Sequence, residues 1–421
     1  MCAVLVSLFV VSCLEWLLFF SPKLLCYCLK LGTAGSSLSL IIIGCSHHLA
    51  LITCLTLGEQ VVASFGETDM LRRLLCSSAA LGSAVRLQTR FTERIGAECP
   101  LVLAPMGGCA GGALAAAVSG AGGVGFVGSG GETVEYLREE WTRAVTDPRV
   151  RRPLLGFGLN VAQLEALPAG TLEALLAELQ PAHVYLSFGN ITPHAAAVLD
   201  AGAAVYSNAG DCETAVAHAA AGATCVVMQG SDAGGHTHER ASAFALIPQA
   251  RSALDDAGYH DTLLVAAGGI SDGRGVAGAL ALGADAAVLG TRFAAAAEST
   301  YDELQKQALV RVQCGASGTT IGRWIDKVNG IDEHSSGLPG RCIINGSTRL
   351  GVREELPLEV RRQIHREGVA AAGDGLEWGT TWAGAAVGLV RDIQPAAEIV
   401  AEVSAEAAAA LDRGARFVRP A

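Results

Sequence analysis

The sequence has little charge and no concentration of positive charge. Charged residues make up 17% of the 421 residues, and 41 acidic against 30 basic side chains give a formal net charge of −11. This balance excludes a nucleic-acid partner, because no basic stripe is available to neutralise phosphates. A small phosphate-bearing ligand is still compatible with the chain, since backbone N–H groups hold phosphate without Lys or Arg.

Motifs that mark several other chemistries are absent as well. The 13 cysteines form no C-x₂-C pair. The sequence has no metal-spaced cluster of His and Asp, no Walker-type loop and no G-x-S-x-G elbow, so no metal site is expected. The six cysteines after residue 80 are expected to be reduced, buried thiols, which places the main domain in the cytoplasm.

The first 58 residues are markedly apolar, with only three charged side chains. Their two long apolar runs, Ala3–Phe20 and Leu38–Leu57, are each close to the roughly 20 residues that span a bilayer. We treat residues 1–86 as an extension with three open interpretations: a membrane anchor, a poorly ordered appendage or a mistaken start site. Membrane association is expected only through residues 1–57. One short helix is expected around Met70–Ala80.

From residue 101 onward, short apolar runs alternate with helical patterns, which is typical of repeated βα units around a parallel sheet. Eight such regularly spaced runs favour a closed (β/α)₈ TIM barrel over an open doubly wound sheet. We therefore predict a barrel domain over 87–300. The eight runs are Leu101–Ala104, Val124–Val127, Leu154–Leu159, His183–Phe188, Ala204–Asn208, Thr224–Met228, Thr262–Ala267 and Ala286–Leu289.

The remaining segment, 301–421, is expected to be mainly helical, with loops around Gly315–Gly318 and Ser335–Gly346. It is too long for a mere tail. Because the functional site of such a barrel opens at the carboxyl ends of its strands, we predict that this segment covers that face. The sequence does not specify an oligomeric state.

A glycine-rich loop with a histidine directly follows the sixth apolar run. It reads Gln229-Gly230-Ser231-Asp232-Ala233-Gly234-Gly235-His236. Gly234 and Gly235 let the backbone approach a ligand closely. Imidazole is suited to removing a proton or stabilising an anion near neutral pH. A histidine in a loop could simply meet solvent, but its position after a strand favours a catalytic role for His236, whereas His238 is expected to be an exposed neighbour.

Two further glycine motifs follow the seventh and eighth runs, where such barrels commonly hold phosphate. Gly268 and Gly269 end one run, and Gly290 with Thr291 ends the next. Each motif alone is ordinary turn chemistry. Together with the histidine loop one strand earlier, they predict a phosphate site.

Other strand ends add candidate contacts to a flat, polar-edged ligand. Ala104, Pro105 and Met106 offer a rigid turn and a soft apolar side chain, although turn formation alone would also explain them. The amides of Asn160 and Gln229 can both donate and accept hydrogen bonds, to a ligand or to neighbouring backbone.

Taken together, these motifs resemble the nitronate monooxygenase family, formerly called 2-nitropropane dioxygenases. The resemblance runs from about Leu87 to Val400 and includes a late Trp382-Ala383-Gly384. It implies non-covalent FMN and oxidation of an alkyl nitronate by O₂ to a carbonyl compound and nitrite. The ligands are then a small nitronate or nitroalkane and O₂, with His236 in the active site. The implied cofactor-binding residues are Ala104, Pro105, Met106, Asn160, Gln229, Gly234, Gly235, Gly268, Gly269, Gly290 and Thr291.

Two substitutions depart from the family pattern, since many members have Glu at the position of Asp232 and Gly at that of His238. They leave the substrate range open. Two alternatives also stay open: an FMN-dependent NAD(P)H reductase of the enoyl-acyl-carrier-protein or quinone type, which shares the Gly-Gly-His loop, and a membrane-anchored flavin-binding protein without turnover.

Overall fold

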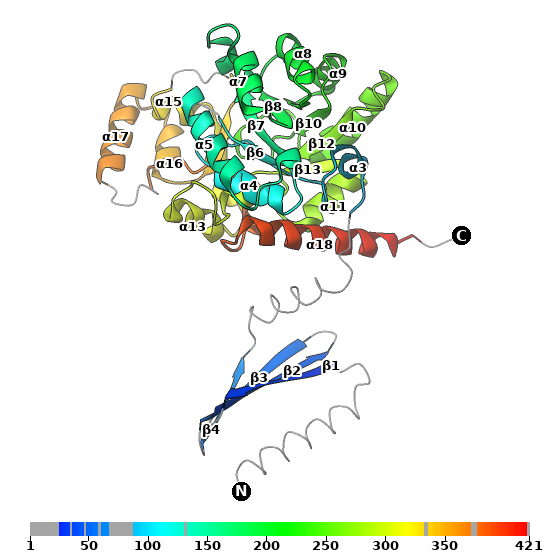
Figure 1. Cartoon of the computed structure of the whole chain (residues 1–421). Helices are drawn as coiled ribbons and strands as arrows, with labels where there is room; N and C mark the ends of the chain where they lie inside the picture. Colours follow the sequence, from blue (N-terminus) through cyan, green and yellow to red (C-terminus); the bar gives the residue numbers. More distant parts are fainter. Residues whose placement is uncertain are drawn as a thin grey trace. The chain divides into compact units, whose positions relative to one another are not determined.

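The computed structural model describes residues 87–129, 133–331, 336–371 and 377–418, and the backbone of four strands nearer the N-terminus. The chain divides into two compact units, Met1–Ala84 and Val85–Ala421. In the first unit the four strands pair antiparallel in the order β1-β2-β3-β4, blue in Figure 1. Their bounds are β1 (Leu25–Thr33), β2 (Ser36–Cys45), β3 (His48–Leu57) and β4 (Gln60–Gly66).

The two predicted apolar runs of the first unit have different outcomes. Leu38–Leu57 is divided between β2 and β3, which pair with each other, so it does not form one long helix. The run Ala3–Phe20 and the short helix expected around Met70–Ala80 lie outside the described residues. None of the described helices combines the length and the apolar character needed to cross a bilayer.

The second unit is built on a ring of eight parallel strands, as the eight apolar runs predicted. The strands follow one another in the order β5-β13-β12-β10-β9-β8-β7-β6. The ring closes between its two ends, because Leu103 N–H donates to Val124 O at 2.9 Å and Val124 N–H donates to Leu101 O at 3.0 Å. This closure excludes the open sheet. The bounds are β5 (Leu101–Leu103), β6 (Gly125–Val127), β7 (Leu155–Asn160), β8 (His183–Ser187), β9 (Ala204–Ala209), β10 (Cys225–Gln229), β12 (Leu263–Ala267) and β13 (Ala286–Leu289).

Helices cover the outside of the ring, so the strands are apolar on both faces. Asp211 caps one helix by accepting from Thr214 N–H at 2.7 Å. Another helix begins at Thr192 with Ile191 as its N-cap and Pro193 in its first turn. The covering helices are α4 (Gly112–Gly120), α5 (Val134–Thr146), α6 (Val161–Glu165), α7 (Thr171–Leu179), α8 (Thr192–Asp200), α9 (Cys212–Ala220), α10 (Ala243–Asp256) and α11 (Gly273–Ala281), with a short 3₁₀ turn η1 (Arg152–Leu154) before β7.

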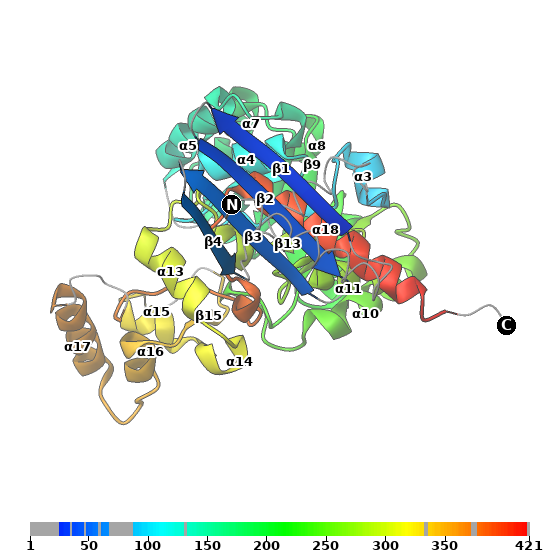
Figure 2. The same ribbon diagram turned by 90° about the horizontal axis from the view of Figure 1, so that it is seen from below.

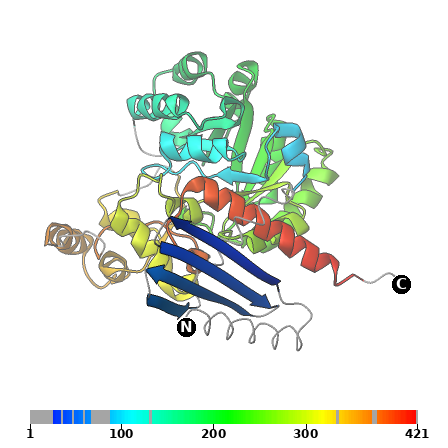
Figure 3. The same ribbon diagram turned by 60° about the horizontal axis from the view of Figure 1, so that its bottom comes forward.

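The outer layer is completed by the last helix of the chain, α18 (Ala396–Ala415). This helix packs against α11 and α4 (Figure 3), and Ile399, Val400 and Val403 belong to the main hydrophobic core between strands and helices. The buried guanidinium of Arg292 bonds to Asp392 and so holds the segment that leads into α18. The helix layer of the barrel therefore includes residues beyond the predicted boundary at 300.

Between β13 and α18 the chain forms a separate group of short elements beside the barrel (Figure 2). The loops expected around Gly315–Gly318 and Ser335–Gly346 are only partly loops. The first range forms a helical turn, and the second contains Gly340–Ile343, the middle strand of a small antiparallel sheet with the order β11-β15-β14. The elements are α12 (Thr291–Ala294), α13 (Glu303–Arg311), α14 (Gly315–Gly318), β14 (Thr319–Gly322), α15 (Trp324–Val328), β15 (Gly340–Ile343), α16 (Gly346–Gly351), α17 (Leu358–Ala371) and η2 (Val387–Leu389), while β11 (Gly235–His236) comes from the loop after β10.

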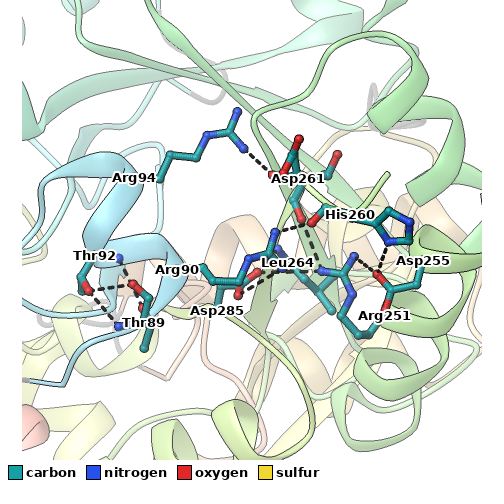
Figure 4. Close-up of polar contacts among 11 residues, drawn as sticks. Thr89, Arg90, Thr92, Arg94, Arg251, Asp255, His260, Asp261, Leu264 and Asp285 are labelled. Atoms are coloured by element: carbon teal, nitrogen blue, oxygen red, sulfur yellow. Dashed lines mark hydrogen bonds and ion pairs between the residues drawn. The ribbon is translucent and has the colours of Figure 1, made fainter. Parts of the chain in front are cut away.

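A short helix, α3 (Arg90–Ile95), packs over the amino ends of the strands. Its Phe91 is fully buried, with its ring 6.5 Å from that of Tyr206 in the barrel interior. The guanidinium groups of Arg90 and Arg94 donate to the backbone oxygens of His260 and Asp261 (Figure 4). The amino ends of the strands are therefore closed by α3, which leaves the carboxyl ends of the strands for a functional site.

The six cysteines of the second unit are free thiols. Cys99, Cys109, Cys225 and Cys342 are buried, as predicted. Cys212 is partly exposed, and Cys314 is exposed at the start of a short helical turn. The expectation of buried thiols is therefore wrong for Cys314.

Candidate active site

The carboxyl ends of the strands carry two kinds of side chain. Successive side chains of a strand point to opposite faces, so residues two positions apart share a face. Tyr185, Tyr206 and Val227 face the barrel interior, and Ser187, Asn208 and Gln229 therefore face it as well, at the strand ends. The same alternation brings Asn160 to the interior end of β7. Four consecutive strands thus end in polar side chains, while the other four end in small ones: Ala267, Gly290, Ala104 and Gly128.

The polar half is joined by a chain of hydrogen bonds. Phe188 N–H donates to Asn208 Oδ1 at 2.8 Å, and Asn208 Nδ2 donates to Gln229 Oε1 at 3.2 Å. Gln229 Nε2 then donates to the backbone oxygen of His236 at 3.2 Å. Phe188 has a φ of +55°, which is uncommon for a residue other than glycine, and its bond to Asn208 supports this conformation. The chain of amides fixes the backbone of the histidine loop.

The small residues at the strand ends lie where the first and last strands of the barrel are neighbours. A Cβ atom on Gly290 would lie 3.4 Å from Met106 Sδ and 3.7 Å from the Cβ of Ala104. Pro105 packs against β7, where a Cβ on Gly158 would lie 2.3 Å from Pro105 Cβ. The predicted residues of these loops therefore lie side by side.

The glycine pair after β12 contacts the histidine loop directly. Gly268 and Gly269 have φ values of +97° and +72°, which only glycine adopts without strain. A Cβ on Gly268 would lie 3.0 Å from Gly230 O, and one on Gly269 would lie 3.0 Å from Asp232 Cβ. The two loops that the sequence placed after neighbouring strands are thus in contact.

His236 is held by residues of the C-terminal segment. Its Nε2 lies 3.0 Å from Oδ2 and 3.2 Å from Oδ1 of Asp326, which is 5% exposed. Its ring lies 5.2 Å from that of Trp382, centroid to centroid. The backbone of Gly235–His236 pairs with that of Gly340–Arg341. These contacts bring the C-terminal segment onto the histidine loop.

Two bonds tie the same segment to both halves of the site. Arg341 donates from Nη2 to Ser231 O at 3.0 Å, and Thr291 Oγ1 accepts from Gly384 N–H at 3.0 Å. Gly234 is tightly enclosed here, since a Cβ at this position would lie 2.5 Å from the backbone of Ala383.

Asn160 and His238 are placed differently from the others. Asn160 Oδ1 caps α6 by accepting from Ala162 N–H at 3.0 Å. His238 is partly buried and packs against the backbone at Gly210, so the expectation that it is exposed is wrong. Burial lowers the pKa of His238 below its ordinary value.

Sequence reasoning missed four residues of this site. Ser187 and Asn208 end strands as Asn160 and Gln229 do, so the same argument would have found them. Asp326 carries no local signal, because it lies 90 residues from His236 in a short helix. Trp382 belonged to a recognised motif, but its contact with His236 depends on how the C-terminal segment folds back.

Comparison with known proteins places this arrangement in a family. The family model described as nitronate monooxygenase matches residues 88–406. The chain is 33% identical over 341 residues to a nitronate monooxygenase from Neurospora crassa, covering 73% of this chain and 88% of that protein.

Solved structures with the same fold include FabK from Thermotoga maritima and a nitroalkane oxidase from Streptomyces ansochromogenes. FabK matches with a TM-score of 0.65 and 25% identity, over 79% of this chain and all of that one. The nitroalkane oxidase matches with a TM-score of 0.59 and 29% identity, over 75% of this chain and 97% of that one. Proteins of this family and fold bind FMN in general. The chain is therefore a flavin-dependent oxidoreductase that belongs to the nitronate monooxygenase family.

Proposed function

We propose that this protein oxidises alkyl nitronates with O₂, giving a carbonyl compound and nitrite, and that it uses FMN to do so. The observation that carries the proposal is the position of His236. A buried carboxylate and an aromatic ring hold its imidazole, in a loop that contacts the glycine pair at 268–269. An acid–base group is thus fixed beside a backbone suited to a phosphate.

The residues at the carboxyl ends of the strands fit FMN. Glycine at 268 and 269 leaves the backbone bare in a turn that a side chain would strain. Thr291 begins α12, and the first N–H groups of a helix have no partner within it, so they suit an anion. Both features lie after the last two strands, where barrels of this kind commonly hold phosphate.

The division of the strand ends into a polar half and a half with small residues also suits a flavin ring. The small residues Ala104 and Gly290 lie beside Met106, and Ala267 ends the neighbouring strand β12, so these positions would present an apolar face to a flat ring. Asn208 and Gln229 use some of their hydrogen-bonding capacity on each other, and each amide has further donor and acceptor sites. These amides would therefore hold the polar edge of the ring.

The chain itself contributes position and proton handling. When bound, FMN supplies the redox chemistry that no side chain here provides. His236 would orient a nitronate that arrives as an anion. With a neutral nitroalkane, His236 would first accept the proton from the carbon that bears the nitro group.

One purification tests the cofactor and the reaction together. The full chain is purified, its bound flavin is released and identified, and nitrite is measured from a simple nitronate in air. We expect FMN and O₂-dependent nitrite. A protein that takes up no FMN, or a loaded protein that releases no nitrite, would contradict the proposal.

The reductase alternative is separated by anaerobic mixing with NADH or NADPH. A monooxygenase of the proposed kind leaves the flavin absorbance unchanged, whereas rapid bleaching by either nucleotide would favour a reductase on the same framework.

A further inference from the structure

We propose that Asp326 is a positioning residue for His236, which sets the ring tautomer and orientation that proton removal from a neutral nitroalkane requires. The inference rests on the proposed function and deepens it. It begins from one contact: both carboxylate oxygens of Asp326 lie within 3.2 Å of His236 Nε2, and both side chains are largely buried.

The contact selects one form of the neutral imidazole. An ionised carboxylate only accepts hydrogen bonds, so the proton of the ring must reside on Nε2. The basic lone pair is then on Nδ1. Without the carboxylate, the ring could adopt either tautomer.

The surroundings hold the orientation of the ring as well. Trp382 lies beside the imidazole with the two rings inclined at 51°. The backbone of His236 pairs with that of Gly340, and Gly340 is itself packed against Trp382. His236 is thus held at its backbone by Gly340, and its ring is held on one side by Trp382 and at Nε2 by Asp326.

The step that benefits is removal of a proton from a neutral nitroalkane. The C–H bond breaks, its proton goes to Nδ1 of His236, and its electron pair is delocalised into the nitro group to give the nitronate. No electron is transferred in this step. The ring becomes an imidazolium whose positive charge faces the Asp326 carboxylate, which compensates it.

A nitronate that is already ionised needs no such step, so it gains little from the carboxylate. The positioning role therefore predicts that loss of the carboxylate affects the neutral compound far more than the nitronate. The competing explanation is that Asp326 merely anchors α15 to the histidine loop, in which case its loss would affect both substrates alike.

Asp326→Asn distinguishes these explanations in the full chain loaded with FMN. Nitroethane and its preformed nitronate serve as probes. We expect kcat/KM for nitroethane to fall by about 100-fold or more, and that for the nitronate by less than about fivefold. An equal fall for both probes, or no fall for either, would overturn the proposal.

Asp285→Asn is the matched control. Asp285 is also buried, at 8% exposure, and accepts from Leu264 N–H at 2.8 Å (Figure 4). It directly precedes β13, so it lies at the amino ends of the strands. The ratio of the two kcat/KM values is expected to stay as in the unchanged protein. A ratio that shifts as it does in Asp326→Asn would mean that any buried carboxylate has this effect, and would overturn the proposal.

A second measurement is independent of turnover. Nitrogen NMR of the histidine rings in the protein without flavin reports which ring nitrogen carries the proton, and His236→Gln assigns the signal. We expect protonated Nε2 in the unchanged protein and a changed tautomer population in Asp326→Asn. Protonated Nδ1 in the unchanged protein would contradict the inference.

The outcomes also separate the two proposals. If the unchanged protein releases nitrite from neither probe, the proposed function fails. If it releases nitrite from the nitronate alone, the proposed function stands and the inference fails.

Discussion

The backbone N–H of Gly384 donates a hydrogen bond to Oγ1 of Thr291 at 3.0 Å, which joins the loop after the last barrel strand to the C-terminal segment. Thr291 is one of the residues that the family resemblance implies for cofactor binding. In the structure its hydroxyl also fastens Trp382-Ala383-Gly384 beside the histidine loop, so one side chain connects the predicted phosphate site to the surroundings of His236.

Thr291→Val should weaken that connection. The substitution keeps the shape of the side chain but removes the acceptor, and leaving the Gly384 N–H without it costs about 1–3 kcal/mol. We expect weaker retention of FMN, measured by flavin absorbance during dialysis. Thr291→Ser, which keeps the hydroxyl, should retain FMN as the unchanged protein does. If the valine variant retained FMN equally well, this bond would have no role in the site.

Gly234→Ala should disrupt the histidine loop by steric conflict. The added Cβ would lie 2.5 Å from Ala383 C and Gly384 N, which are backbone atoms that cannot rotate away. We expect destabilisation of about 1–3 kcal/mol and lower FMN affinity, measured by thermal unfolding and flavin titration.

Gly278→Ala provides the control for that variant. Gly278 lies in α11, and a Cβ there meets no atom within 4 Å. Alanine should stabilise the helix by about 0.5–1 kcal/mol. Equal thermal unfolding of the two alanine variants would contradict the close packing at Gly234.

His236→Asn should separate catalysis from cofactor binding. The amide cannot accept a proton from carbon, so turnover of a neutral nitroalkane should fall about 10²–10⁴-fold. FMN should stay bound, because the glycine pair and the amide chain are unchanged. Nitrite release and the flavin spectrum measure the two properties. Loss of FMN from this variant would show that His236 holds the cofactor instead.

His183 should make the stability of the barrel depend on pH. Burial lowers the pKa of His183 from 6.5 to about 4, and its Nε2 bonds to Pro153 O at 2.9 Å. Below pH 6.5 the unfolded chain takes up a proton that the folded chain refuses. The free energy of unfolding should therefore decrease as the pH falls from 6.5 to 4, by roughly 3 kcal/mol from this residue.

His183→Gln tests this contribution. Glutamine can still donate to Pro153 O but does not titrate, so chemical unfolding between pH 7 and 4 should show a smaller pH dependence than in the unchanged protein. The other titrating groups are common to both proteins, and their effects cancel in the comparison. Identical pH dependence in the two proteins would contradict the assignment.

Much of the barrel could be predicted from the sequence because its signals are local. Each strand is a short apolar run, and the carboxyl ends of parallel strands in a closed ring meet at one end. That rule placed Gln229, Gly268 and Gly290 near one another without any knowledge of side-chain contacts. The same rule applies to Ser187 and Asn208, the polar residues at the ends of the fourth and fifth strands.

The C-terminal segment was less predictable because its structure depends on distant contacts. The strand Gly340–Ile343 exists by pairing with the histidine loop and with Thr319–Gly322, and its own sequence has no strong strand pattern. Helix α18 completes the outer layer of the barrel although more than 100 residues separate it from β13. The division of the chain at residues 86 and 300, and a covering role for 301–421, remain predictions.

The sequence by itself determined the eight-stranded barrel and the cluster of glycines and amides with His236 at one end of it, since strand periodicity and chain order are sufficient for both. Only the tertiary structure decided that Asp326 and Trp382 lie against His236. Such a contact depends on the path by which a long segment returns to the barrel, and that path is set by the packing of many residues that no short motif records.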